Sequence, residues 1–283
     1  MDGMSTPEDG LSAVARLLAG GGVAVLSGAG LSTESGIPDY RGPDGIRRHR
    51  APMTYQEFLA GEPARRRYWA RSHAGRAVIA GARPNAGHYA VARLRDSGRI
   101  SAVITQNVDG LHRAAGTADA VELHGGLDRV ICLGCAAVSP RRELDERLAA
   151  LNPAFRDAGS RINPDGDVEL PDALVESFTV ADCARCGGVL KPDVVFFGES
   201  VPKDRVELCY RLVDEARALL VLGSSLAVMS GLRFVRHAAK AGKPVAIVTR
   251  GTTRGDDLAT TRLDRPLGET LTALADLLAA RPR

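Results

Sequence analysis

Four of the five cysteines form two Cys-x2-Cys pairs, and this pattern restricts the fold more than any other feature of the chain. The pairs are Cys132 with Cys135 and Cys183 with Cys186, and 47 residues lie between them. Two such pairs supply four thiolates for a closed tetrahedral zinc site, and sites of this kind contribute roughly 10–16 kcal/mol of apparent binding free energy to folding. We predict one structural Zn²⁺ on these thiolates and a zinc-binding module over residues 125–191. The alternative is two unrelated cysteine pairs or a redox motif.

The rest of the chain alternates short apolar runs with amphipathic stretches, which is typical of a parallel sheet covered by helices on both faces. Strands are expected at 23–26, 102–105, 218–222 and 245–248, and helices at 11–19, 64–76, 86–96, 205–215, 231–241 and 271–279. We predict an α/β fold with a Rossmann-like, doubly wound parallel sheet built from residues 1–124 and 192–283. A helical insertion at about 43–83 and the zinc-binding module interrupt this sheet domain.

Composition excludes several classes of protein. Hydrophobic residues make up 45% and charged residues 25% of the 283 residues, as in ordinary globular chains. The net charge of +3 is too small to predict nucleic-acid binding. The most apolar window, 218–229, is interrupted by Gly223, Ser224 and Ser225 and is shorter than the ~20 residues of a membrane helix. The first ten residues do not resemble an export signal. We expect reduced thiols, a cytoplasmic location and no membrane partner. Cys209 is expected to be a small buried core residue.

Glycines and polar residues follow the first expected strand. Gly28-Ala29-Gly30 comes directly after it, where a backbone without side chains can approach a pyrophosphate and amide groups can bind the anion. This signal is weak by itself, because Thr33 stands where the dinucleotide fingerprint needs its third glycine and roughly half of such loops are only tight turns. However, the loop continues through Ser32, Ile37, Pro38, Asp39, Tyr40 and Arg41 as a long polar segment. Long loops at the carboxyl end of a strand are usually functional.

Three further loops of this kind follow later strands. Gln106, Asn107, Val108 and Asp109 follow the second strand, where ligands bind in open α/β sheets, although Asp109 could simply cap a helix. His124 ends a short strand and has the side chain best suited to general-base catalysis near neutral pH, although periodicity does not distinguish it from His112. Gly223-Ser224-Ser225 follows the third strand and suits a phosphate or a ribose. The segment 191–199 is either another core strand or an exposed edge that pairs with an extended peptide.

Together these motifs resemble the complete series of the sirtuins, the NAD-dependent protein-lysine deacylases, over nearly the whole chain. The stretches 67–71, 164–168 and 253–259 further resemble the class II branch, which includes the sirtuin 4 type. The resemblance implies that NAD lies across the strand ends, with its pyrophosphate near Ala29, Gly30 and Ser225 and its nicotinamide near Ile37, Asn107 and Asp109. It places Thr249, Arg250 and Gly251 at the adenosine ribose, where Thr249 replaces the usual asparagine.

The same resemblance implies a mechanism and substrates. Asn107 and His124 are the expected catalytic residues, with His124 taking a proton from a ribose hydroxyl after nicotinamide leaves. Val195, Phe197 and Gly198 are expected to bind an acyl-lysine protein substrate, and a monomer is the expected state. Tyr68 and Arg71 share one helix face and resemble the pair that selects acidic acyl groups, because arginine and tyrosine can both donate to a carboxylate. A solvated basic helix face is the alternative for this arginine-rich segment.

Three other functions remain open at this point. A mono-ADP-ribosyltransferase would use the same departure of nicotinamide but pass the ribose to another acceptor. A binding module, either an NAD sensor or a zinc-containing adaptor for nucleic acid, is disfavoured by the near-neutral charge and the 4% of aromatic residues. An ordinary NAD dehydrogenase is disfavoured by the missing third glycine and by the lack of an acidic residue at the end of the second strand.

Overall fold

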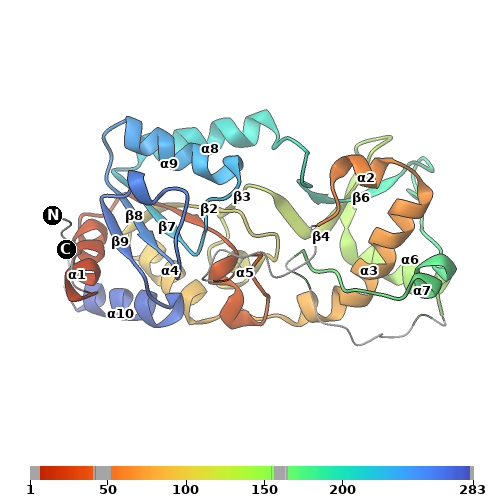
Figure 1. Cartoon of the computed structure of the whole chain (residues 1–283), viewed down its shortest axis with the longest axis horizontal. Helices are drawn as coiled ribbons and strands as arrows, with labels where there is room; N and C mark the ends of the chain where they lie inside the picture. Colours follow the sequence, from red (N-terminus) through yellow and green to blue (C-terminus); the bar gives the residue numbers. More distant parts are fainter. Residues whose placement is uncertain are drawn as a thin grey trace.

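The larger of two sheets contains six parallel strands in the order β3-β2-β1-β7-β8-β9 (Figure 1). The computed structural model describes residues 7–40, 42, 52–153, 155, 163 and 165–280. The strands of this sheet are β1 (Val23–Ser27), β2 (Ile100–Thr105), β3 (Val121–Glu122), β7 (Ala218–Leu222), β8 (Val245–Val248) and β9 (Thr261–Leu263). The chain order changes direction between β1 and β7, which pair in parallel from Val23 with Ala218 to Ser27 with Leu222. In open α/β sheets such a switch point is where a ligand binds.

Helices cover both faces of this sheet, as predicted. On one face lie α1 (Pro7–Ala19), α4 (Ala86–Asp96) and α10 (Leu267–Ala279), and on the other lie α8 (Lys203–Glu215) and α9 (Met229–Lys240). Alternate strand residues serve the two layers: Val25 packs with the first group of helices, whereas Ala24 and Leu26 pack with the second. The fifth cysteine, Cys209, is fully buried in the second layer, as expected.

The predicted elements are confirmed, but several are longer in the structure. Helices α8 and α10 begin four or fewer residues before their predicted starts, directly after Pro202 and Pro266. A proline is well suited to the beginning of a helix, and the first turn of α8 has no buried residue that would extend its apolar period. The three-residue strand β9 gave no signal, because it is shorter than the runs that periodicity can detect.

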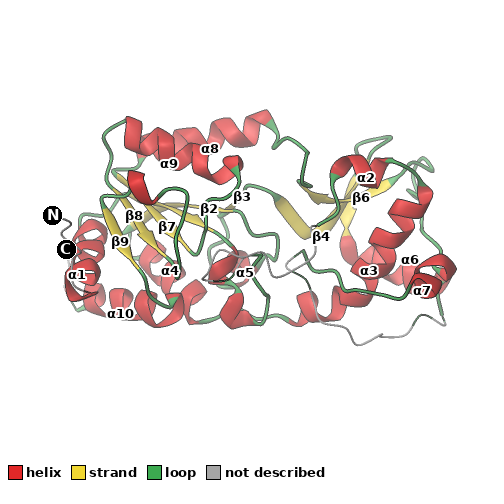
Figure 2. Ribbon diagram, viewed as in Figure 1, coloured by secondary structure: helices red, strands yellow, loops and turns green. Residues whose placement is uncertain are grey.

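The smaller sheet is antiparallel and has the order β5-β4-β6, with β4 (Gly125–Cys132), β5 (Val138–Pro140) and β6 (Leu190–Val194). Helices α6 (Arg141–Leu151) and α7 (Asp172–Ser177) come from the same part of the chain, whereas α2 (Tyr55–Leu59) and α3 (Glu62–Gly81) come from the helical insertion. All of them gather at one end of the molecule (Figure 2). Trp69 of α3 is fully buried there and donates from Nε1 to the carbonyl of Leu190 at 3.2 Å. The two predicted insertions therefore share one hydrophobic core.

A glycine allows α3 to approach the loop that follows the undescribed segment after residue 155. A Cβ atom on Gly75 would lie 2.3 Å from the carbonyl oxygen of Gly166, so any larger residue would push the loop away. The remaining short elements are α5 (Leu111–Ala114) and the 3-10 turns Ala29–Leu31, Thr33–Ser35 and Asp256–Leu258. Across the described ranges, no helix combines the length and the apolar character that a membrane crossing needs.

Candidate active site and metal centre

A cavity of about 790 Å³ lies at the carboxyl ends of β1, β2, β7 and β8 and extends to the smaller sheet. Most of the residues predicted to bind the cofactor line it: Gly28, Ala29, Gly30, Ser32, Ile37, Pro38, Asp39, Tyr40, Gln106, Asn107, Val108, Asp109, Gly223, Ser224, Ser225, Thr249 and Arg250. The same cavity is lined by His124 and by the predicted substrate residues Tyr68, Val195, Phe197 and Gly198. Loops as far apart in the chain as those of Gly28 and Arg250 are thus brought to one site.

Of the predicted residues, Gly251 and Arg71 are not part of the described cavity lining. Arg41 falls outside the described residues. Gly251 follows β8 with the other two residues of its group but is not part of the described cavity lining, and its amide donates to Asp264 at 3.3 Å. Arg71 is also absent from that lining.

The polar loops after β1 and β2 are joined by a directed chain of hydrogen bonds. The Asn107 side-chain amide donates to the hydroxyl of Ser32 at 3.0 Å and to the Gly28 carbonyl at 3.2 Å. The Ser32 hydroxyl in turn donates to Oδ2 of Asp109 at 2.7 Å. Both donors of the Asn107 amide are used, so its carbonyl oxygen is the group left to accept from a ligand. The chain holds an amide and a carboxylate in fixed positions before any ligand binds.

Asp109 both hydrogen-bonds the start of a helix and lines the cavity. Its Oδ1 atom accepts from the amide of Leu111 at 2.9 Å, at the start of α5, while Oδ2 holds Ser32. Burial raises the pKa of the Asp109 carboxyl, and the hydrogen bonds from Leu111 and Ser32 oppose that rise because they favour the ionised form. The N-cap of α5 is Gly110, so Asp109 stands one residue before it and combines a hydrogen bond to the first helical amide with a place in the cavity.

His124 lies across the cavity with both ring nitrogens engaged. Its Nδ1 atom is 2.9 Å from the carbonyl oxygen of Gln106, and Nε2 is 2.8 Å from the hydroxyl of Ser230. A carbonyl oxygen can only accept, so Nδ1 carries the proton and Nε2 presents its lone pair. Burial lowers the pKa of His124, the hydrogen bond to Gln106 opposes this, and the guanidinium of Arg205 lowers the pKa further. The ring is thus kept neutral at physiological pH, as a general base requires.

His112, which the sequence could not distinguish from His124, lies outside the cavity lining and is fully buried. Its Nε2 atom is 2.8 Å from the Ser27 hydroxyl, and its ring contacts that of His88 edge to face. Burial lowers the pKa of His112 to about 3 and that of His88 to about 4. These two histidines are core residues beneath the loops rather than candidates for catalysis.

The glycines of the first and third loops allow those loops to pack against each other. A Cβ on Gly30 would lie 2.9 Å from the Gly223 carbonyl oxygen, and a Cβ on Gly28 would lie 2.8 Å from the Ser224 side chain. The amides of Gly28 and Gly30 donate to the carbonyls of Leu222 and Gly223 at 2.9 and 2.8 Å. The prediction that glycine amides here bind an anion needs correction for these two residues, because both amides are used within the protein.

Arg71 is buried and is held by acidic residues. Its Nε atom is 3.0 Å from Asp167 and 2.9 Å from the Val168 carbonyl, and its terminal nitrogen is 2.6 Å from Glu169. Tyr68, three residues earlier on α3, does line the cavity. Asp165 lines the cavity as well, and burial together with the neighbouring Asp167 raises the pKa of its carboxyl to about 7. The geometry therefore brings Tyr68 to the cavity but leaves Arg71 paired elsewhere.

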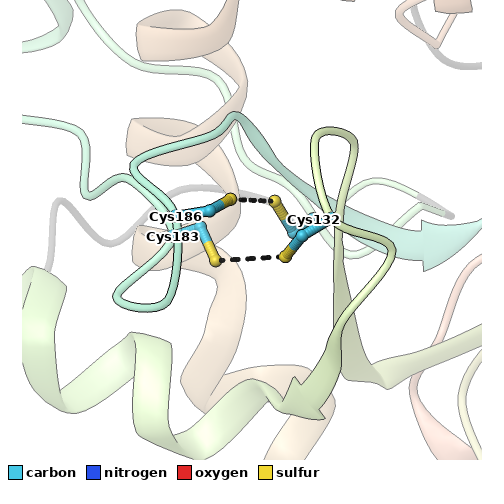
Figure 3. A group of neighbouring side chains, drawn as sticks. Cys132, Cys183 and Cys186 are labelled. Carbon is cyan, nitrogen blue, oxygen red and sulfur yellow. Dashed lines mark hydrogen bonds between the residues drawn. The ribbon is translucent and has the colours of Figure 1, made fainter.

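The four paired cysteines converge on one point of the smaller sheet. Their sulfur atoms all lie within 4.8 Å of one another, with 3.5 Å between Cys132 and Cys186 and 3.9 Å between Cys135 and Cys183 (Figure 3). Sulfurs placed about 2.3 Å from a central zinc ion in a tetrahedron are about 3.8 Å apart. A disulfide would need about 2.05 Å. The spacing fits a four-thiolate zinc site, and it leaves no coordination position for a substrate.

Among the cavity-lining residues that were not predicted as site residues, two polar ones bear on the chemistry. The hydroxyl of Ser230, at the start of α9, is within hydrogen-bond distance of Nε2 of His124. Asp165 lines the same cavity as Tyr68. Ser230 carries no signal, since a serine at a helix start is common. Asp165 belongs to a stretch that was noted only for its family resemblance. Both acquire their place through contacts with segments far away in the chain.

Comparison with known proteins decides the family. A family model described as "Sir2 family" matches residues 28–230, which is well over half of the chain. The chain belongs to the Sir2 family. The predicted family is therefore confirmed, and the matched range includes every polar loop described above except the one after β8.

Named relatives and solved structures agree with this Sir2 assignment. The NAD-dependent protein deacetylase 1 of Streptomyces coelicolor is 62% identical over 271 residues, covering 96% of this chain and 91% of the relative. The NAD-dependent protein deacetylase 1 of Mycobacterium avium is 53% identical over 272 residues, with 94% and 95% covered. A solved complex of a Sir2 with a p53 peptide and NAD⁺ matches with a TM-score of 0.76 and 28% identity, over 95% of this chain and 99% of that chain.

Proposed function

We propose that this Sir2 chain is an NAD-dependent protein-lysine deacetylase that transfers the acyl group to ADP-ribose and releases nicotinamide and free lysine. The observation that carries the proposal is the neutral His124, with Nε2 presenting its lone pair in the same cavity as the linked Asn107, Ser32 and Asp109. A general base and a pre-arranged set of polar groups are what an acyl transfer through a ribose hydroxyl requires. The relatives' names and the NAD⁺-bound neighbour support the same conclusion.

Different residues of the cavity would bind different parts of NAD. When bound, NAD supplies the ribose carbon that loses nicotinamide and accepts the acyl oxygen. Asp109 would accept from the nicotinamide carboxamide, and the Asn107 carbonyl and Ser32 would orient the ribose. Ser224 and Ser225 would bind the pyrophosphate, together with Ala29. Thr249 and Arg250 would lie beside the adenosine ribose. The cavity fits such a dinucleotide because it spans the ends of β2, β1, β7 and β8 without interruption.

His124 holds and moves the proton. Its Nδ1–H is anchored on the Gln106 carbonyl, so the ring takes a proton only at Nε2. Removing a proton from a ribose hydroxyl makes that oxygen able to attack the activated acyl carbon. A positioned general base of this type contributes typically ~10²–10⁴-fold in rate.

The segment from Val195 to Gly198 would hold the acyl-lysine peptide. The Val195 amide donates to the His124 carbonyl at 2.8 Å, which joins this segment to the turn between β3 and β4 that carries His124. Glu199 fixes its far end by accepting from the Phe196 amide at 2.9 Å and from Lys191 at 3.1 Å. Phe197 is partly exposed and contacts Tyr40 edge to face. A rigid, partly apolar edge beside the base is suited to an extended substrate.

A short neutral acyl group fits the lining of the cavity near Tyr68 and Asp165 better than an acidic acyl group does. Binding of an acidic acyl group by Arg71 would require the guanidinium to leave Asp167 and Glu169, and it would bring a carboxylate toward Asp165.

We further propose membership of the class II branch, supported by the stretches 67–71, 164–168 and 253–259. We also propose one structural Zn²⁺, a monomer and a cytoplasmic location.

The test is deacylation of an acetyl-lysine peptide by a His124→Ala variant. Turnover should fall by about 10²–10⁴-fold, while zinc content and thermal unfolding should stay as in the parent. His237→Ala is the matched control, since His237 lies on the exposed face of α9 and pairs with Asp214. If NAD is consumed in the absence of an acyl-lysine peptide and its labelled ADP-ribose appears on protein, ADP-ribosyl transfer would be favoured instead. Near-parental deacetylation by His124→Ala would remove His124 from the mechanism.

A further inference from the structure

Ser230 is the residue at which the second half of the sheet reaches the catalytic histidine. It is the second residue of α9, it lines the cavity, and it lies 106 positions after His124 in the chain. Its hydroxyl is 2.8 Å from Nε2 of His124, the atom that must receive the proton. The polar loops already discussed do not include this residue.

The direction of this hydrogen bond follows from the other side of the ring. Nδ1 carries its proton because it faces the Gln106 carbonyl, so Nε2 of the neutral ring can only accept and the Ser230 hydroxyl donates. When Nε2 gains a proton the roles reverse, since a hydroxyl also accepts. The bond to the protonated ring is the stronger of the two, because hydrogen bonds to charged groups exceed those between neutral groups. The Ser230 hydroxyl can therefore remain hydrogen-bonded to Nε2 both before and after that atom gains a proton.

The remaining surroundings of His124 disfavour its protonated form. Burial lowers the pKa of the ring, and the Arg205 guanidinium on α8, which donates to the Leu123 carbonyl at 3.3 Å, lowers it further. The Gln106 carbonyl acts in the opposite direction but at Nδ1. Ser230, on α9, is thus the polar group that stands at Nε2 itself. Without it, Nε2 would have to accept a proton beside a cation with no hydrogen-bond partner among the described residues.

We propose that Ser230 is a positioning residue for the reaction: its hydroxyl holds the His124 ring and sustains the basicity of Nε2 in the resting enzyme, and yields that atom to the ribose hydroxyl of NAD. The inference rests on the proposed function in that His124 is taken as the base. It adds a residue outside the polar loops, located on the helix after β7, as a direct partner of the reacting nitrogen.

Removing the hydroxyl should lower the pKa of His124 in the resting enzyme. In Ser230→Ala, the midpoint of the His124 titration should move downward by roughly 0.5–1 pH unit, because the lost hydrogen bond is stronger to the protonated ring than to the neutral ring. We would measure this by NMR with ¹⁵N-labelled histidine, without NAD, and assign the signal by its loss in His124→Gln. The parent spectrum should show a protonated Nδ1 and an unprotonated Nε2. This measurement requires no activity, so it remains decisive even if the proposed reaction is wrong.

Kinetics provides the second readout. The acid limb of kcat/KM for NAD reports the free form of the site and should shift downward with the NMR midpoint, and the plateau should fall by about three- to tenfold. The acid limb of kcat should move less, because a ribose hydroxyl then occupies the place of Ser230. Ser230→Thr retains a hydroxyl and should restore both the midpoint and kcat/KM. Ser177→Ala, at an exposed serine on α7, is the matched control.

Two outcomes would overturn the proposal. One is a Ser230→Ala enzyme whose His124 midpoint is unchanged or raised. The other is a downward shift that Ser230→Thr does not restore, which would mean that the hydroxyl is not the cause. A purely structural role for Ser230 would lower the unfolding temperature of Ser230→Ala but leave the titration of His124 where it was.

Discussion

The two sheets of this Sir2 protein are stabilised by different means. In the six-stranded sheet, every residue of β1, β7 and β8 is buried, and helices on both faces supply apolar partners. In the three-stranded sheet, β5 is largely exposed, and the core includes two of the clustered cysteines, Cys132 and Cys183. A sheet buried on both faces is stabilised by apolar surface alone, whereas a small body lacks the area for this and needs a crosslink or a metal. The difference implies that the two parts respond to different perturbations.

Loss of zinc should reduce stability the most. It should destabilise the part of the molecule built around the three-stranded sheet (the smaller body) rather than the part built around the six-stranded sheet (the larger body). Cys183→Ser leaves three thiolates, which cannot complete the tetrahedron, and the metal contributes roughly 10 kcal/mol or more to folding of such sites. We expect low solubility or an early unfolding transition together with loss of bound zinc, measured by metal analysis and calorimetry.

Cys209→Ala is the matched control for that experiment. Cys209 is fully buried in the core of the larger sheet, where burial raises the pKa of its thiol to about 12. This variant should keep its zinc and lose at most about 1 kcal/mol. A soluble, active and zinc-free Cys183→Ser protein would show that the smaller body does not depend on metal.

The next effect concerns the ion pairs that join α3 to the loop after residue 163. Arg71→Met leaves Asp167 partly buried without its cation, and the free energy of unfolding should fall by about 2–3 kcal/mol in urea titration. Arg93→Met is the control on the larger body, since its pair with Asp276 is exposed and should be worth less than about 1 kcal/mol.

The same Arg71 variant decides the question of acidic acyl groups. With the guanidinium held by Asp167 and Glu169, we expect acetyl-lysine to be turned over better than succinyl-lysine by the parent, and the ranking to be the same in Arg71→Met. A parent enzyme that prefers succinyl-lysine, with the preference lost in the variant, would establish Arg71 as a ligand for acidic acyl groups and contradict this interpretation.

A further expected effect is a pH dependence that arises from two buried histidines under the six-stranded sheet. His88 and His112 have folded-state pKa values of about 4 and about 3, below the value of about 6.5 in an unfolded chain. The unfolded state therefore binds more protons, and stability present above pH 6.5 should be lost as the pH falls toward 4 and 3, by up to roughly 1.4 kcal/mol per pH unit for each histidine.

Urea titrations between pH 7 and pH 4.5 would measure this slope, with the zinc content followed in parallel. The double variant His88→Gln, His112→Gln should show a shallower slope. An unchanged slope would mean that other groups govern the acid sensitivity of the larger sheet.

Much of the fold and the site could be predicted from local patterns. The strands β7 and β8 and the helix α4 coincide with the predicted ranges, because each is a strong apolar or amphipathic run with turn-forming residues at its ends. The polar loops could be assigned to one edge of the sheet because parallel strands end at the same edge. The convergence of the four cysteines follows from the chemistry of the thiolate, and spacing was enough to predict it.

The rest depended on contacts between segments far apart in the chain. His124 and His112 look alike in the sequence, and they differ only because one lines the cavity while the other packs on His88 and Ser27. Arg71 has the spacing of an acyl-binding residue, yet its partners come from residues about a hundred positions later. Ser230 reaches His124 from the other half of the sheet. Amino-acid patterns determine which groups stand at strand ends, because strand and helix periods are local. Which groups face each other across a cavity is decided by packing, because it depends on how distant segments fill the same space.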